Sequence, residues 1–551
     1  MKMKKYIWGF LFMAVLLSLS GIGTLQVEAA KKEKQSKYFM AEDIYYKIIA
    51  KDRVAACGLK LKKDKKQIHD LWKSDTLWIP PHVIYKGKKY KVTEMADYTY
   101  RSHDGPPEWD SEEYVYGQAE GINLPAYRLY HYVDFPNLRL DDWDFCEFQR
   151  ADNIKTVILP DTLTYIGEGA FCRWPKLKKV VFAKKYKKLT IGINAFAGLK
   201  WKSITFPEGT YELKRCAAGS IPEITIPSTV KKIGAEVVNA DTKKVTISKK
   251  NKKFKMKDGI LYSYDEKQLL GASANVKSSV SISKKTRSIA KNAFARTNVK
   301  QVNLRNQIKS IPKGAFAYCK KLEKVSGTNA VTKIDYAAFT KCKKLKTIGK
   351  VPKLKHIARA AFWQNKKLKI HLSSTIKDIE EYAFGCKEYA CRIRVSVAAG
   401  NPYFFVKDGV LIKKDGEEQT LLIQTGIKEK EGLTILPEGI TNIPVAVSIL
   451  NGDGIIFPTT LKQQDGKVFA EAAPVVYQTM EPPDFGKYYS LSEDKATIYV
   501  PKGAAIDTYK KMISDVYNNK DDSSIYIWKE EGGQLKIMEI PEKDNNESFW
   551  K

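Results

Sequence analysis

The dipeptide Ala-Phe recurs along this chain at nearly constant intervals, and this repeat constrains the fold more than any other feature. The last five repeats place their phenylalanines 22, 23, 23 and 22 residues apart. An isoleucine stands upstream of each Ala-Phe, and in four units a leucine follows six residues after the phenylalanine. The repeated phenylalanines are Phe171, Phe196, Phe294, Phe316, Phe339, Phe362 and Phe384.

A unit of this length holds one short β-branched segment and too few apolar residues to bury its own face. When such units stack, each apolar position becomes a continuous ladder through a shared core. We therefore predict a repeat solenoid that is mainly β, with short helical or 3-10 turns and units of about 22–23 residues. Good repeats run over 154–206 and 286–384, and degenerate ones lie between and after them.

Two segments of similar sequence interrupt the repeats. They are NKKFKMKDGIL at Asn251–Leu261 and NPYFFVKDGVL at Asn401–Leu411, displaced from each other by 150 residues. Each places Asp-Gly between two β-rich runs, which is the sequence signal of a two-residue hairpin turn. We expect β-hairpin insertions near 251–275 and 401–425.

The repeat pattern I-x-x-I-[GAP]-x-x-A-F-x-x-C-x-x-L resembles the BspA-type leucine-rich repeat of secreted and cell-surface bacterial proteins, from about Leu77 to about Lys511. The resemblance implies a leucine-rich repeat horseshoe that acts as a binding scaffold, commonly in adhesion to host or microbial partners. The expected organisation is a signal peptide at 1–29, an N-terminal linker and β-rich cap at 30–96, an insertion at 97–150, the solenoid at 151–495, and a C-terminal cap and polar tail at 496–551.

The N-terminus predicts export. Lys2, Lys4 and Lys5 precede an apolar run over 7–19, and Val27-Glu28-Ala29 forms a small-x-small cleavage pattern. This order is that of a secretory signal peptide. We expect a secreted, extracellular or surface-associated protein with no membrane span after cleavage, because no later segment is apolar over the length that a span needs. Genomic nucleic acid is therefore not an expected partner.

The chain is strongly basic, with 94 Lys and Arg against 62 Asp and Glu, a formal net charge of +32. Pairs of lysines occupy the same position in three consecutive repeats: Lys320 and Lys321, Lys343 and Lys344, and Lys366 and Lys367. Stacking would bring these like charges onto one ridge, at a cost of about 1 kcal/mol or less per solvated pair. The ridge is either a partner-binding surface or a device for solubility and edge protection, and the sequence leaves both open.

The cysteines beside these lysines raise the question of thiol chemistry. Cys319 and Cys342 fall three residues after their phenylalanines, and the next unit has Asn365 at that position. A nucleophile or metal ligand would not alternate with asparagine, so we interpret the position as a small polar group facing the backbone of the turn. Disulfides between Cys319 and Cys342, or between Cys386 and Cys391, remain alternatives.

Residues 97–150 depart from the pattern. They contain no lysine, twelve acidic residues, four arginines and twelve aromatic residues, for a net charge of −8. Aromatic platforms beside carboxylates suit sugar rings or a protein hot spot. The segment is either a binding surface or a structural, cap-like insertion. Its candidate partner-binding residues are Trp109, Tyr114, Tyr116, Tyr130, Tyr132 and Trp143.

Motifs of enzyme chemistry are missing from the sequence. The six histidines form no H-x-x-x-H zinc pair, and neither a G-x-S-x-G elbow nor a phosphate-binding glycine loop is present. We therefore expect no catalysis, no cofactor and no metal. The predicted function is binding of a host or microbial surface protein or glycan. The alternatives are an envelope component held electrostatically to anionic cell-wall polymers and, less favoured, a secreted enzyme.

Overall fold

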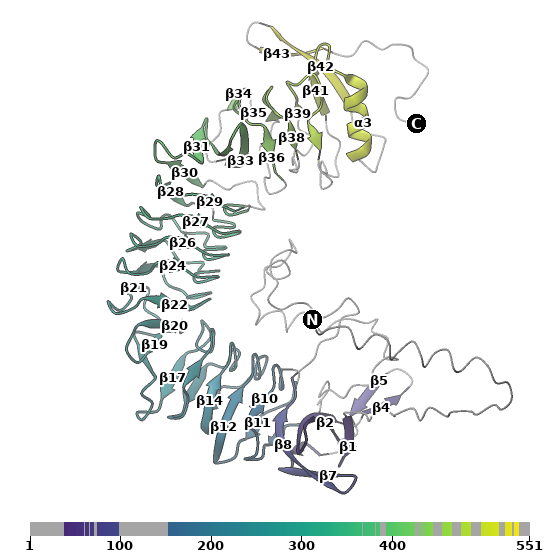
Figure 1. Ribbon diagram of the computed structural model, residues 1–551, viewed down its shortest axis with the longest axis vertical. Helices are drawn as coiled ribbons and strands as arrows, with labels where there is room; N and C mark the ends of the chain where they lie inside the picture. Colours follow the sequence, from purple (N-terminus) through teal and green to yellow (C-terminus); the bar gives the residue numbers. More distant parts are fainter. Residues whose placement is uncertain are drawn as a thin grey trace, which may run out of the picture.

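The structure is a computed structural model of the chain. It describes residues 38–59, 61–64, 67–70, 74–97, 153–172, 174–365, 367–380, 382–385, 393–424, 429–430, 433–444, 455–464, 475–485, 497–516, 524–531 and 534–538. Successive coils stack into a curved array, with β8 near one end and β41–β43 and α3 at the other (Figure 1).

Two rows of short, mostly parallel strands run along the array. The first row contains β8 (Lys88–Met95), β10 (Tyr165–Ile166), β12 (Lys185–Ile191), β14 (Glu208–Leu213), β16 (Lys232–Ile233), β20 (Gln268–Ala272), β22 (Ser288–Ile289), β24 (Ser310–Ile311), β26 (Lys333–Ile334), β27 (His356–Ile357), β29 (Asp378–Ile379), β33 (Glu418–Gln424), β36 (Asn442–Ile443), β38 (Gln463–Gln464) and β40 (Asp484–Phe485).

The second row lies across the core from the first. It contains β6 (Thr76–Trp78), β9 (Thr156–Ile158), β11 (Lys179–Val181), β13 (Ser203–Thr205), β15 (Glu223–Ile226), β17 (Lys244–Ile247), β21 (Ser279–Ser281), β23 (Gln301–Asn303), β25 (Lys324–Ser326), β28 (Lys369–Leu372), β30 (Arg394–Val397), β35 (Leu433–Ile435), β37 (Ile455–Ile456), β39 (Val475–Val476) and β41 (Thr497–Pro501). The two-residue β34 (Glu429–Lys430) pairs antiparallel with β35.

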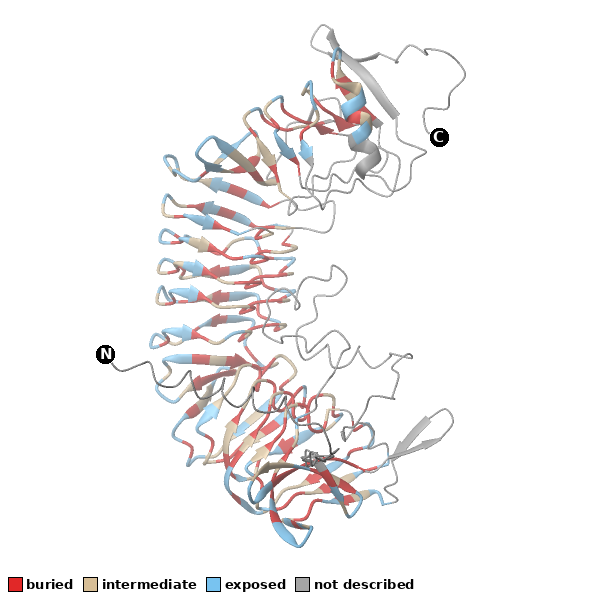
Figure 2. Ribbon diagram, turned by 45° about the vertical axis from the view of Figure 1, so that its right-hand side comes forward, coloured by how far each residue is buried: buried red, intermediate tan, exposed pale blue. Residues whose placement is uncertain are grey.

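Alternating side chains explain why these short segments form strands. In β25 the central Val325 is fully buried, whereas Lys324 is exposed, and the pattern repeats along both rows (Figure 2). One inward β-branched residue per strand is enough because the strands above and below extend its contacts.

The Ala-Phe dipeptides lie in the turns that lead from the first row to the second. The turns stack through hydrogen bonds from one coil to the next, such as Phe316 N donating to Ala338 O at 2.8 Å and Phe339 N donating to Ala361 O at 2.7 Å. The rings of Phe294, Phe316, Phe339, Phe362 and Phe384 stack with centroid separations of 5.1, 5.1, 5.3 and 5.4 Å. The predicted ladder is therefore a column of parallel rings in the core.

The turn geometry requires a left-handed residue two positions before the phenylalanine. Gly314 has a φ of +62° there, and Ala337 has a φ of +51° in the next coil. A Cβ on Gly314 would lie 1.9 Å from Asn292 Oδ1, so this glycine also allows a close approach between coils. The turns close with hydrogen bonds that span three residues, such as Ala317 N donating to Gly314 O at 2.9 Å, in line with the short turns expected from the sequence. Within the described ranges the helical element is α3 (Ile506–Val516).

Both predicted hairpins are present. β18 (Phe254–Lys257) and β19 (Ile260–Ser263) pair antiparallel around Asp258-Gly259, and β31 (Phe404–Lys407) and β32 (Val410–Asp415) do so around Asp408-Gly409. The turn residues have positive φ in each case, as the Asp-Gly signal indicates. In each unit a third strand, β20 or β33, returns the chain to the first row.

Further strands extend the two ends of the array. At the N-terminal end, β1 (Tyr38–Ala41), β2 (Ile44–Ala50) and β3 (Arg53–Leu59) form a meander that joins β8, with β7 (His82–Tyr85) beside it and β4 (Leu61–Asp64) paired with β5 (Gln67–Asp70). At the C-terminal end, β42 (Ser524–Glu531) pairs with β41, and β43 (Gln534–Met538) pairs with β42. The domain boundaries drawn from the sequence remain predictions.

Candidate functional site

Cys319 and Cys342 of the repeats lie in the core, and their thiols hydrogen-bond to backbone carbonyl oxygens. Cys319 Sγ lies 2.9 Å from Phe294 O, and Cys342 Sγ lies 3.0 Å from Phe316 O. Asn365 makes the same contact in the next coil, with Nδ2 donating to Phe339 O at 2.8 Å. Cys319 and Cys342 are both free thiols. The interpretation of this position as a small polar group facing the turn agrees with these contacts.

Burial makes this position unsuited to thiol chemistry. It raises the pKa of the Cys342 thiol well above its usual value, and the neighbouring Cys319 raises it further. The thiolate is the reactive form of cysteine, so a neutral, buried thiol is a poor nucleophile. The adjacent lysines do not reverse this effect, because their side chains are exposed to solvent while the sulfur is not.

We use the name lysine ridge for Lys320, Lys321, Lys343, Lys344 and Lys367. All five side chains are exposed, directly after the Ala-Phe turns of three successive coils. Within the described part of the chain none of them forms an ion pair. Their exposure leaves them available to solvent, and both the ridge and its role in binding stay predictions.

Other predicted residues lie outside the described residues. These are Lys366, Cys386 and Cys391, the signal peptide at 1–29, and the aromatic candidates Trp109, Tyr114, Tyr116, Tyr130, Tyr132 and Trp143.

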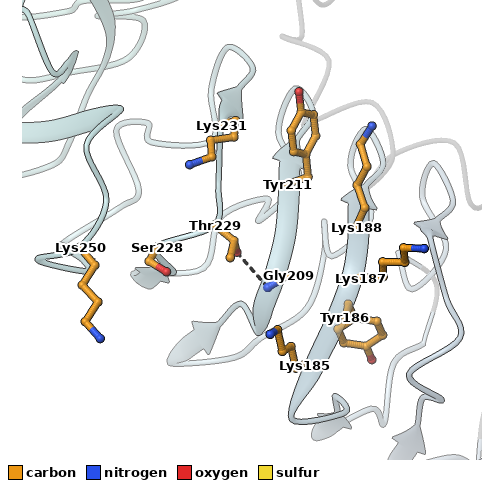
Figure 3. Close-up of a pocket in the computed structure, with 10 residues that line it drawn as sticks. All are labelled: Lys185, Tyr186, Lys187, Lys188, Gly209, Tyr211, Ser228, Thr229, Lys231 and Lys250. Carbon is orange, nitrogen blue, oxygen red and sulfur yellow. Dashed lines mark hydrogen bonds between the residues drawn. The ribbon is translucent and has the colours of Figure 1, made fainter.

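A second basic feature, which the sequence analysis did not find, lies between the first-row strands β12, β14 and β16. It is a pocket of about 390 Å³ that we call the lysine pocket (Figure 3). Its lining residues are Lys185, Tyr186, Lys187, Lys188, Gly209, Tyr211, Ser228, Thr229, Lys231 and Lys250. Five lysines thus line one depression, and no lining residue is acidic.

Short hydrogen bonds hold the floor of the lysine pocket. Gly209 N donates to Thr229 Oγ1 at 2.9 Å, and the Thr229 hydroxyl donates to Thr210 O at 2.9 Å. Gly209 has a φ of +90°, and a Cβ there would lie 1.9 Å from Tyr186 O. Only glycine fits this close approach of β14 to β12. The floor of the pocket is therefore formed by backbone atoms and the short hydroxyl side chains of Ser228 and Thr229.

The lysine pocket escaped sequence analysis because its charges come from three parts of the chain. β12 supplies Lys185, Lys187 and Lys188. Lys231 lies in the connection between β15 and β16, and Lys250 lies in the connection that follows β17. The available signal was the repeated Lys-Lys pairs at 184–185, 187–188, 231–232 and 249–250. Reading them together requires the register of strands β12 and β14, in which a bulge falls between Lys185 and Leu189.

One group of metal-ligating residue types also forms between coils. His356 Nδ1 lies 2.6 Å from Asp378 Oδ2, and His356 Nε2 lies 3.2 Å from Glu380 Oε1. The second oxygen of Glu380 accepts a hydrogen bond from Arg359 N at 2.7 Å. These contacts satisfy the three side chains among themselves, and we assign no ligand to the group.

Comparisons with known proteins identify the repeats. The family model of the BspA type leucine rich repeat region matches six copies over residues 144–258 and 272–390. A search of curated proteins finds no match.

Solved leucine-rich repeat structures also match the chain. A leucine-rich repeat protein of Eubacterium ventriosum is 20% identical, with 43% of this chain and 77% of that chain covered and a TM-score of 0.33. A leucine rich cell surface protein of Faecalibacterium prausnitzii is 17% identical, with 66% of this chain and 96% of that chain covered and a TM-score of 0.36. The pneumococcal vaccine antigen PcpA is 14% identical, with 89% of this chain and 98% of that chain covered and a TM-score of 0.32.

Within the described ranges, no helix has the length and hydropathy to cross a bilayer.

The residues matched by the family model form the coils whose Ala-Phe turns, paired strand rows and ring column are described above. Residues 144–258 and 272–390 of this chain are therefore BspA-type leucine-rich repeats.

Proposed function

We propose that the chain is an extracellular or cell-surface binding scaffold that holds another macromolecule, a protein or glycan, without catalysis. The observation that carries this proposal is the lysine ridge. Its ammonium groups are exposed and lack ion-pair partners within the described chain, and the stacked turns hold their backbone positions in register. A preset row of like charges repels itself until an anionic partner neutralises it.

A salt series on the full chain tests the proposal. Binding to isolated cell walls and to host-cell surfaces is measured with increasing sodium chloride. Because exposed charges are screened within about 10 Å at 0.1 M salt, we expect the bound fraction to fall steeply at moderate salt. Retention that is unchanged at about 1 M salt contradicts an electrostatic scaffold.

A matched pair of variants locates the binding surface. Lys320→Gln, Lys343→Gln, Lys344→Gln and Lys367→Gln together remove four ridge charges, and the control removes four from Lys284, Lys285, Lys353 and Lys502, which are also exposed. At roughly 0.2–1 kcal/mol for each exposed contact, the loss of four contacts should weaken binding by the ridge variant at least about fourfold. Equal losses in both variants would show that net charge alone governs attachment.

Selectivity is proposed to come from the acidic, aromatic segment at 97–150, whose net charge of −8 is opposite to that of the solenoid. A chain lacking these residues should keep the salt-sensitive attachment to anionic surfaces but lose discrimination among surface proteins and glycans. A glycan and protein array with both chains measures this difference. An unchanged binding profile would assign the segment a structural role.

A further inference from the structure

We propose that the lysine pocket binds a segment of an acidic polysaccharide, whose sugar rings carry carboxylate or sulfate groups. This inference rests on the proposed scaffold function and names a second site, away from the lysine ridge, together with the chemistry of its ligand. Five exposed lysines from separate segments of the chain line a depression of about 390 Å³ (Figure 3). That volume lies in the range of ligand sites, about 300–1,000 Å³, and exceeds what one small anion needs.

The charge of the lysine pocket is not neutralised from within. Among the described residues, Lys185, Lys187, Lys188, Lys231 and Lys250 form no ion pair. Folding therefore gathers five like charges in a hollow where the field of each adds to the others. An anionic ligand relieves that repulsion, which favours binding beyond the direct contacts.

Glu208 is an acidic residue that pairs with Lys185 across the β12–β14 strand pair. Its carboxylate is occupied by hydrogen bonds within the protein. Its carboxylate accepts hydrogen bonds from Ser228 N at 3.1 Å and from Ser228 Oγ at 2.9 Å. Partial burial opposes ionisation of Glu208, but the hydrogen bonds from Ser228 and Thr229 outweigh it and hold the pKa of this carboxyl below its usual range. The carboxylate thus orders the floor of the pocket and is not among its lining groups.

Tyr211 restrains the lysines at one side of the pocket. Lys188 Nζ lies 4.6 Å from the centroid of the Tyr211 ring, and Lys232 Nζ lies 5.9 Å from it. Figure 3 shows Lys188 and Tyr211 extending side by side from adjacent strands. A cation held over a ring has fewer rotamers to lose on binding, so these ammonium groups are partly preorganised.

The residue types favour an acidic glycan over a nucleic acid. All the cationic groups are lysines, which act as point charges, whereas the planar fork of arginine is preferred for phosphates and nucleic acids. Nucleic-acid strands also need aromatic faces for stacking bases. Here Tyr186 is buried and Tyr211 is engaged by lysines. The hydroxyl groups of Ser228 and Thr229 add polar partners of the kind that sugar hydroxyls use.

Binding by the full chain to a short heparin oligosaccharide and to an oligogalacturonide tests the inference and separates sulfate from carboxylate as the charged group. Neutral dextran and a DNA duplex serve as comparison ligands. The pocket variant combines Lys185→Gln, Lys231→Gln and Lys250→Gln, and the control combines Lys284→Gln, Lys285→Gln and Lys353→Gln. We expect about a tenfold loss of affinity in the pocket variant for at least one acidic glycan, and less than a twofold change in the control.

Tyr211→Leu provides a second variant with no change in net charge. It removes the ring that restrains Lys188 and Lys232, so glycan affinity should fall about threefold. The slope of affinity against salt should stay as in the parent chain, because the number of charges is the same. Preserved circular dichroism and melting temperature in each variant confirm that the change is local.

Several results overturn the inference. One is an equal loss in the pocket and control variants, and another is binding of DNA more tightly than of either glycan, with the same dependence on the pocket lysines. Cell-wall binding of the same variants separates this failure from that of the proposed function. If the parent chain binds walls in a salt-sensitive way but the pocket variant binds acidic glycans normally, the site is wrong and the scaffold stands. If the parent chain binds none of these surfaces, both proposals fail.

Discussion

At the scale of single residues, one column of side chains shows what the repeat demands. Thr297, Cys319, Cys342 and Asn365 occupy the same position in four coils. Cys319, Cys342 and Asn365 each direct a polar group to the phenylalanine carbonyl of the preceding coil, whereas the Thr297 hydroxyl donates to Phe294 O in its own coil. A hydroxyl, a thiol and an amide are interchangeable there because the position requires a small buried donor. The tolerance of the column therefore follows from hydrogen bonding and is unrelated to thiol reactivity.

Substitutions at Cys342 test this requirement. Cys342→Ser keeps a donor near Phe316 O, and Cys342→Ala removes it and leaves a small void. Phe316 O also accepts from Cys319 N at 3.2 Å, so we expect a loss of about 1–2 kcal/mol for alanine and about half of that for serine. Urea unfolding of both variants measures the difference. Equal stability of the alanine variant and the parent chain would contradict a bonding role for this thiol.

The raised pKa of Cys342 predicts a dependence on alkaline pH. The thiol keeps its proton in the folded chain at a pH where the unfolded chain loses it, so the folded state binds more protons. Its contribution to stability is complete below the usual thiol pKa of 9.0 and falls as the pH rises above it. Urea unfolding between pH 8 and 10.5 should show this loss, and Cys342→Ser should reduce it. A serine variant with the same alkaline loss would place its origin elsewhere.

At the scale of elements, the turns and not the strands carry the most specific packing. First-row strands such as β24 and β26 have two residues each, whereas the turns between rows contribute the ring column and their own hydrogen-bond ladder. The ring column is continuous over five coils, and its neighbouring ring planes are tilted by at most 9°. Each of the three inner rings thus gains from the coil above and the coil below.

Phe339→Leu should cost more stability than Phe294→Leu. Phe339 stacks on Phe316 and on Phe362, while Phe294 has one stacked ring, Phe316. Both side chains are fully buried, so the lost apolar area is similar and the difference reports the second ring contact. We expect the two costs to differ by about 0.5–1.5 kcal/mol in urea unfolding. A larger cost at Phe294 would show that ring stacking is not the main contribution.

At the scale of the whole molecule, the open ends of the strand rows are the places where a solenoid is exposed to self-association. At the C-terminal end, β41 covers the edge of β39, and α3 lies against the last coil. Tyr509 of α3 is fully buried, and its ring centroid lies 5.6 Å from that of Tyr477. Its hydroxyl donates to Thr479 O at 2.9 Å. These contacts close the end of the C-terminal hydrophobic core, which contains Val475 and Ile498.

Removing residues 497–551 should therefore cause self-association. The truncation exposes the edge of β39 and the ring of Tyr477, and an unpaired strand edge beside an apolar face is a site for pairing with another chain. Light scattering after size exclusion measures the effect. A chain that lacks only 541–551 keeps every described element and should behave as the full chain does. A monomeric 497–551 truncation would show that the cap does not protect the edge.

The sequence by itself determined the features that depend on one repeat. The period predicted the solenoid, Asp-Gly predicted both hairpins, and the alternation of Cys342 with Asn365 predicted a structural thiol. Each of these predictions depends on local geometry or on a position that recurs at a fixed spacing. The repeats can therefore be aligned with one another from the sequence alone.

The tertiary structure alone decided what depends on register between coils of unequal length. The lysine pocket is lined by Lys185 of β12 together with Lys231, which precedes β16, and Lys250, which follows β17. The left-handed conformation of turn residues such as Ala337 is likewise a property that only the backbone shows. The hydrogen bonds that link each turn to the coil beside it, such as that from Phe316 N to Ala338 O, likewise follow from the register between coils. Spacing in sequence predicts which residues stack, but only the register between coils decides which charges meet.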